Sequence, residues 1–162
     1  MVRKIISGGQ TGADRAALDF AIKRNVPHGG WVPKGRRAED GRIPDFYQLQ
    51  EMPVESYAGR TEQNVIDSDG TLIISHGNLT GGTANTAEMA RKHVRPWLHL
   101  DMMELTVDEA AQRLQEWIAG NDIAVLNVAG PRQSGDQKIY GITMRVLEAA
   151  ANAFDKITAA WK

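Results

Sequence analysis

Residues 3–14 read RKIISGGQTGAD, and this stretch decides the fold that we expect for the chain. The apolar run from Arg3 to Ile6 is typical of a strand, and the three glycines that follow it within five positions predict a tight turn. From Thr11 to about Arg24, apolar residues recur at the spacing of an amphipathic helix. A strand, a glycine-rich turn and a helix in this order form a corner whose backbone N–H groups and helix N-terminus favour an anion.

Two polar residues at the start of this helix have candidate roles. Thr11 has the side chain of a helix cap, and Asp14 stands three residues later, like the acid of a capping box. The Asp14 carboxylate has a second candidate role, a hydrogen bond to a ribose hydroxyl or an amine of a ligand. Capping is the role that we expect.

Length and composition predict one domain, residues 1–162, since 42% of the residues are hydrophobic. The formal net charge is −1 and the basic residues are dispersed, so we expect no nucleic-acid partner. No cysteine and no signal-peptide pattern are present, which favours a cytoplasmic protein. No apolar run approaches the roughly 20 residues that cross a bilayer, so we expect no membrane insertion.

Apolar runs alternate with helical patterns along the chain. Strands are predicted at 3–6, 29–32, 71–75, 96–100 and 123–128, and helices at 11–24, 60–68, 84–90, 106–119 and 138–154. Thr106 and Glu109 form a capping box at the start of one of these helices. Strands that are apolar throughout are typical of a parallel sheet covered on both faces. We therefore expect an α/β fold, a three-layer Rossmann-like domain with a mostly parallel, doubly wound sheet of about five or more strands.

The segment from Pro33 to Pro53 is polar and is predicted to be irregular. An irregular segment of about 20 residues in a small domain is usually functional, so we interpret it as a cover over a site. Its Lys34 and Arg36 are candidate ligand contacts.

Two further corners with glycine follow later strands. One contains Gly81, Gly82 and Thr83, and the other contains Gly130, Pro131, Arg132 and Ser134. Because the carboxyl ends of parallel strands lie at one edge, the three corners are expected to converge on one crevice. The first corner is neither a GxxxxGK[ST] loop nor a GxGxxG loop. The candidate phosphate-binding residues are Gly8, Gly9, Gln10, Thr11, Gly12, Asp14, Gly81, Gly82, Thr83, Gly130, Pro131, Arg132 and Ser134.

Arg60 and Glu88 are the candidate pair for chemistry, because they flank the strand at 71–75 and could meet across the crevice. The carboxylate would stabilise a sugar cation or activate water while the arginine holds a phosphate. The alternative is a structural ion pair. The histidines show no ligand spacing, so no metal ligated by protein side chains is expected.

Several groups of residues together resemble the putative molybdenum carrier family, over nearly the whole chain. The resemblance implies a Rossmann-like fold of the class shared with the lysine decarboxylase-like cytokinin-activating proteins, whose members bind nucleotides or their derivatives. It also implies molybdenum cofactor, a pterin with a terminal phosphate, as candidate cargo. The matching residues are 8–19, 33–36, 39–41, Arg60, Thr61, Asn64, 68–71, 81–83, 127–132 and Ser134.

The cytokinin-activating phosphoribohydrolases have a signature in which an arginine precedes an aspartate by nine positions, followed by PGGxGTxxE. Arg60 and Asp69 keep that spacing, and Glu88 aligns with the glutamate. The resemblance implies that Glu88 and Arg60 would cleave the N-glycosidic bond of a nucleoside monophosphate, with Asp69 as a further contact. Ala84 and Asn85 replace the third glycine and the threonine of the signature, which weakens this interpretation.

We therefore expect a carrier or sensor for a phosphorylated pterin or nucleotide-like ligand, with molybdenum cofactor as candidate cargo. The alternatives are the phosphoribohydrolase-like enzyme and a scaffold domain with a vestigial pocket. A homo-oligomer is also expected, because the apolar helices of this fold class often pair.

Overall fold

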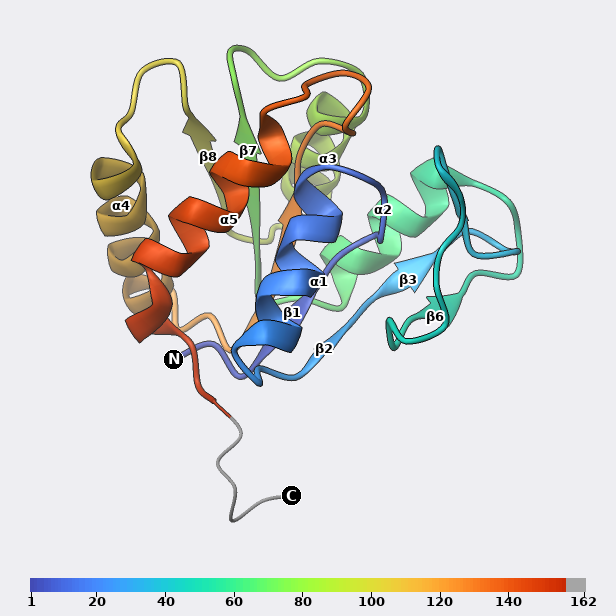
Figure 1. The fold of residues 1–162 in the computed structure, drawn as a ribbon, viewed down its shortest axis with the longest axis horizontal. Coiled ribbons are helices and arrows are strands. Elements are labelled where there is room, and N and C mark those ends of the chain that lie inside the picture. Colours follow the sequence, from blue (N-terminus) through green and yellow to red (C-terminus); the bar gives the residue numbers. More distant parts are fainter. Residues whose placement is uncertain (157–162) are drawn as a thin grey trace.

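The computed structural model describes residues 1–156 and contains a central sheet of five parallel strands (Figure 1). The chain runs outward to each edge of this sheet in turn, and its last strand returns to the centre, so the sheet is doubly wound as predicted. The strands lie in the order β2 (His28–Gly29), β1 (Lys4–Ile6), β9 (Val125–Ala129), β7 (Gly70–Ser75) and β8 (Trp97–Asp101).

Helices cover both faces of the sheet and complete the predicted three layers (Figure 1). One face carries α1 (Ala13–Lys23), α4 (Val107–Gly120) and α5 (Ile139–Ala149). The other carries α2 (Tyr57–Ile66) and α3 (Gly81–Lys92), which pack against each other. Within residues 1–156, no helix has the length and apolar character to span a membrane.

The two faces of the sheet differ in polarity. Alternate residues of a strand point to opposite faces. Leu72 and Val128 belong to the large apolar core together with residues of α1, α4 and α5. Thr71 and Asn127 point to the side of α2 and α3, where Asn127 Nδ2 donates to Thr71 Oγ1 at 3.2 Å. Polar groups are therefore available beneath α2 and α3.

The strand predicted at 29–32 is divided at Gly30. β2 belongs to the central sheet, whereas β3 (Trp31–Val32) leaves it and pairs in parallel with β6 (Gln50–Glu51). Figure 1 shows β3 and β6 to one side of the main sheet.

The segment at 33–53 is ordered by its own small core, so the prediction of an irregular cover was wrong. It contains the hairpin of β4 (Arg37–Ala38) and β5 (Gly41–Arg42). Ile43 and Tyr47 of the segment pack against Leu18 of α1. No residue of the segment lines the main cavity described below.

The helix ends agree with the predictions at α4 and differ from them at α1 and α5. The capping box of α4 is confirmed, because Thr106 Oγ1 and the Glu109 carboxylate each accept the other residue's N–H at 3.2 Å. Thr11 and Asp14 do not form the predicted cap of α1, because its N-cap is Gly12 and the Asp14 carboxylate accepts from Gln10 N and Arg60 Nη1. The last predicted helix is shorter than expected, since α5 gives way to a 3-10 turn (Ala151–Ala153).

Candidate ligand-binding site

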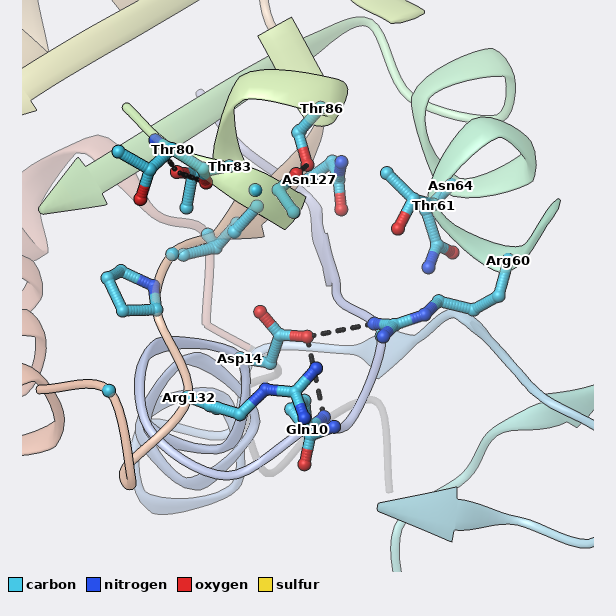
Figure 2. A pocket seen from close by; sticks show the side chains of 18 residues that line it. Gln10, Asp14, Arg60, Thr61, Asn64, Thr80, Thr83, Thr86, Asn127 and Arg132 are labelled. Atoms are coloured by element: carbon cyan, nitrogen blue, oxygen red, sulfur yellow. Dashed lines mark hydrogen bonds and ion pairs between the residues drawn. The ribbon is translucent and has the colours of Figure 1, made fainter. Parts of the chain in front are cut away.

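A cavity of about 330 Å³ lies where the three corners meet, at the carboxyl ends of β1, β9 and β7 (Figure 2). These are the three central strands of the sheet, next to the point where its winding changes direction. The predicted convergence of the corners on one crevice is thereby confirmed. The cavity is lined by Gly8, Gln10, Asp14, Arg60, Thr61, Asn64, Thr80, Gly81, Gly82, Thr83, Thr86, Asn127, Val128, Ala129, Gly130, Pro131, Arg132 and Gly135.

A buried ion pair forms one wall of the cavity. Arg60 Nη1 donates to Asp14 Oδ2 at 3.1 Å, and the two residues are 8% and 5% exposed. The backbone N–H of Gln10 donates to the same oxygen. Burial raises the pKa of the Asp14 carboxyl above its usual range, although the Arg60 guanidinium opposes this rise. A buried acid with a perturbed pKa in a cavity is typical of a functional site.

Two buried nitrogen donors in this wall have no acceptor among residues 1–156. They are Gln10 Nε2 and Arg60 Nε. The orientation of the Gln10 amide is determined by its oxygen, which accepts the N–H groups of Thr11 at 3.0 Å and Glu39 at 2.8 Å. Unpaired buried donors are costly, so an acceptor supplied at this wall would be stabilising.

The first corner uses several of its N–H groups for hydrogen bonds within the protein. The N–H groups of Gly9 and Thr11 donate to the side chains of Ser7 and Gln10. Gly9, Thr11 and Gly12 do not line the cavity. Gly12 has a φ of +81°, and a Cβ there would lie 2.4 Å from Pro131 O. The glycine therefore allows the third corner to approach the first. Of the contacts predicted in the first corner, Gly8, Gln10 and Asp14 line the cavity.

The carboxylate of Glu39 occupies the position between the first and third corners. It accepts from the Thr11 hydroxyl, from Ser134 N at 3.0 Å and from Ser134 Oγ at 2.5 Å. Hydrogen bonds from Ser134 and Thr11 lower the pKa of the Glu39 carboxyl. Thr11 and Ser134, which we predicted to contact a phosphate, are thus bound to an acid of the protein itself.

The second corner has free N–H groups. Gly81 and Gly82 begin α3, a helix of 12 residues, and no part of the chain up to residue 156 accepts from their N–H groups. A Cβ added at Gly82 would have no neighbour within 4 Å. This helix N-terminus is therefore the part of the cavity wall best suited to an anion.

Arg132, a predicted phosphate contact, lines the cavity and adds a positive charge there. Its side chain is exposed, and its Cζ lies 5.7 Å from the centre of the Tyr57 ring. Arg60 Cζ lies 5.4 Å from the same ring. The two guanidinium groups thus share one aromatic neighbour, and each has N–H groups to offer a phosphate.

Four further predicted site residues lie away from the cavity. Glu88 is exposed on α3, outside the cavity lining, so the proposed meeting of Arg60 with Glu88 was wrong. Lys34 is exposed. Arg36 is buried, and its guanidinium donates to main-chain carbonyls of residues 43, 44 and 47. Asp69 precedes β7 at the opposite edge of the sheet, where it accepts the N–H groups of residues 124 and 125.

The structure adds polar residues that were not among the predicted contacts. Thr61 and Asn64 of α2, Thr80 and Thr86 around the start of α3, and Asn127 of β9 line the cavity. Asn127 had a signal in the sequence, since it interrupts an apolar strand. In residues 1–156, no three His, Cys, Asp or Glu side chains are grouped so as to hold a metal ion.

The comparisons with known proteins place this fold and cavity in a family. The sequence model of the Circularly permutated YpsA SLOG family matches residues 5–151, and the chain belongs to this family. A crystal structure of a "Putative molybdenum carrier protein" from Syntrophus aciditrophicus SB is similar, with a TM-score of 0.91 and 58% identity over 92% of this chain and 94% of that chain. The resemblance found in the sequence is thereby confirmed. No curated protein matches. The family supports a ligand-binding role.

Proposed function

We propose that the protein binds a phosphorylated pterin or nucleotide-like ligand in this cavity and acts as its carrier or sensor. The observation that carries the proposal is the pair of unpartnered buried donors, Arg60 Nε and Gln10 Nε2, in a cavity that also contains the free N-terminus of α3. These groups complement an anion with several acceptor oxygens.

Molybdenum cofactor is the cargo that we propose first. The similar crystal structure is that of a "Putative molybdenum carrier protein". Molybdenum cofactor combines a pterin ring with a terminal phosphate. A phosphate at Gly81 and Gly82 would leave the ring among the polar side chains beneath α2 and α3. No residue of the protein needs to ligate the metal in this arrangement.

A carrier agrees better with the site than a phosphoribohydrolase does. The glutamate that would stabilise a sugar cation, Glu88, is exposed and outside the cavity lining. Arg60, the other member of that pair, is bound to Asp14.

The first experiment is native mass spectrometry of protein purified without added ligand, followed by denaturing release, metal analysis and identification of the released molecule. Release of a pterin phosphate with molybdenum supports the role of molybdenum cofactor carrier. Release of a nucleotide supports a carrier or sensor of a nucleotide-like ligand. If no phosphorylated compound is retained, and none binds when added, the cavity is vestigial and the proposal is wrong.

A substitution at Gly82 tests the position of the anion. Gly82→Glu adds a carboxylate at the N-terminus of α3, in open space, where it stabilises the helix and repels an anionic ligand. Gly82→Gln adds a side chain of the same size without the charge. We expect the glutamate variant to fold at least as stably as the glutamine variant and to bind the ligand at least tenfold more weakly. Equal affinities of the two variants would mean that the anion does not bind at the N-terminus of α3.

A further inference from the structure

Asp14 is the only carboxylate among the residues that line the cavity. An acid in the wall of a site for an anionic ligand is unfavourable, unless the ligand presents a hydrogen-bond donor to it. The ion pair with Arg60 explains why the carboxylate is tolerated, but it involves only one of the two oxygens.

The two oxygens of Asp14 have different surroundings. Oδ2 accepts from Arg60 Nη1 and from the backbone N–H of Gln10. Oδ1 accepts no hydrogen bond from any residue between 1 and 156. Figure 2 shows this second oxygen on the side of the carboxyl group that faces away from Arg60. An ionised carboxylate offers about four lone-pair positions, so Oδ1 has unused accepting capacity inside the cavity.

The groups around the cavity therefore divide into two kinds. Donors, namely the N–H groups of Gly81 and Gly82 together with Arg60 Nε and Gln10 Nε2, are suited to a phosphate. Asp14 Oδ1 is suited to an N–H group and repels an anion. A ligand that satisfies both kinds has an anionic end and a separate end that donates hydrogen bonds.

We infer that Asp14 is a specificity-determining residue, whose free oxygen accepts a hydrogen bond from the exocyclic amino group of a 2-amino-4-oxopyrimidine ring, which pterins and guanine share. This inference rests on the proposed function and narrows its ligand class. A ring with an oxo group in place of the amine would place two acceptors against each other at a buried site. Such a mismatch is strongly disfavoured.

Two matched pairs of probes test the inference. Pterin-6-carboxylate and lumazine-6-carboxylate differ in the 2-amino group, which lumazine replaces with an oxo group. Guanosine and inosine 5′-monophosphates differ in the presence of the same amino group. We expect the wild-type protein to bind the amino member of a pair at least tenfold more tightly, measured by fluorescence titration for the first pair and by calorimetry for the second.

Asp14→Asn gives the sharper expectation. Arg60 and the Gln10 N–H both donate toward this side chain, so the amide oxygen takes the place of Oδ2 and the NH₂ group faces the ligand. The preference for pterin over lumazine is then expected to reverse, and the preference for the guanosine nucleotide is expected to disappear. Glu88→Gln is the matched control, since it removes an exposed carboxylate outside the cavity lining and should leave both preferences unchanged.

The outcomes separate the inference from the proposed function. Equal binding of both members of a pair by the wild-type protein overturns the inference alone, and this result does not depend on the folding of any variant. A folded Asp14→Asn protein with unchanged preferences also overturns it. If none of the four probes binds, the inference is wrong, and only the identification of a co-purified phosphorylated ligand of another kind would preserve the proposed function.

Discussion

The Asp14 carboxylate and the Arg60 guanidinium join helices from opposite faces of the sheet, with 3.1 Å between Oδ2 and Nη1. Asp14 lies in the first turn of α1 and Arg60 lies in α2, so the ion pair crosses the carboxyl edge of β1. Gly8 makes this crossing possible, because a Cβ at this position would lie 1.5 Å from Arg60 Nη1. The Gly8 backbone, the Arg60 guanidinium and the Asp14 carboxylate are thus packed together beside the cavity.

Gly8→Ala is expected to displace Arg60 and leave the buried Asp14 carboxylate without its partner. Breaking a buried ion pair costs about 3–5 kcal/mol, so we expect a loss of several kcal/mol in the free energy of unfolding, measured by urea denaturation. The control is Gly141→Ala in α5, where an added Cβ meets nothing within 4 Å. That variant should gain about 0.5–1 kcal/mol, because alanine favours the helix. A Gly8→Ala protein as stable as the wild type would contradict this account of the ion pair.

Asp14→Asn is expected to change how stability depends on pH. The folded protein raises the pKa of Asp14 above its unfolded value of 3.8, so the folded state binds this proton more tightly than the unfolded state does. The contribution of this carboxyl to stability is therefore greatest below that value, and it falls as the pH rises toward the folded pKa. Denaturation of both proteins at a series of pH values above 3.8 should show a wild-type stability that declines relative to the variant as the pH rises. A wild-type stability that instead increases relative to the variant as the pH rises would mean that pairing with Arg60 affects the pKa of Asp14 more than burial does.

Glu39→Ala is expected to loosen the contact between the first and third corners. Ser134 N donates to the Glu39 carboxylate, so hydrogen exchange at the Ser134 amide should become faster in the variant. Glu55→Ala is the control, since Glu55 forms an exposed ion pair with Arg37 away from the corners. The lowered pKa of Glu39 means that its contribution is present above the unfolded value of 4.5 and is lost as the pH falls through the folded pKa. At acidic pH, the Ser134 amide should therefore exchange at similar rates in Glu39→Ala and Glu55→Ala. If Glu39→Ala leaves this exchange rate unchanged at neutral pH, Glu39 does not hold the two corners together.

Glu88→Gln is expected to have no effect beyond the ordinary range for a surface substitution. The residue is exposed and lies outside the cavity lining, so the free energy of unfolding should change by less than about 0.5 kcal/mol. Ligand affinity should also be unchanged. The measurement that checks the enzymatic alternative is release of ribose 5-phosphate from nucleoside monophosphates. Release by the wild-type protein that is lost in Glu88→Gln would restore that alternative.

Sequence patterns alone predict the order of the elements and the edge at which the corners meet. Both follow from local patterns: apolar runs form strands, the Thr106 and Glu109 pair caps a helix within one turn, and parallel strands place all their carboxyl ends together. The exposure of Glu88 was also available in principle. Thr83, Thr86, Ala87 and Ala90 are the buried residues of α3, and their helical spacing leaves position 88 on the outer face.

Which groups at that edge are free for a ligand depends on tertiary packing. The glycines of the first corner suggest an anion site, but Ser7, Gln10 and Glu39 accept hydrogen bonds from three of its donors, the N–H groups of Gly9 and Thr11 and the Thr11 hydroxyl. The partner of Arg60 proved to be Asp14, which is 46 positions away in the chain. Sequence patterns record the conformation that a segment prefers, whereas the availability of an N–H group or a carboxylate depends on which distant segment packs against it.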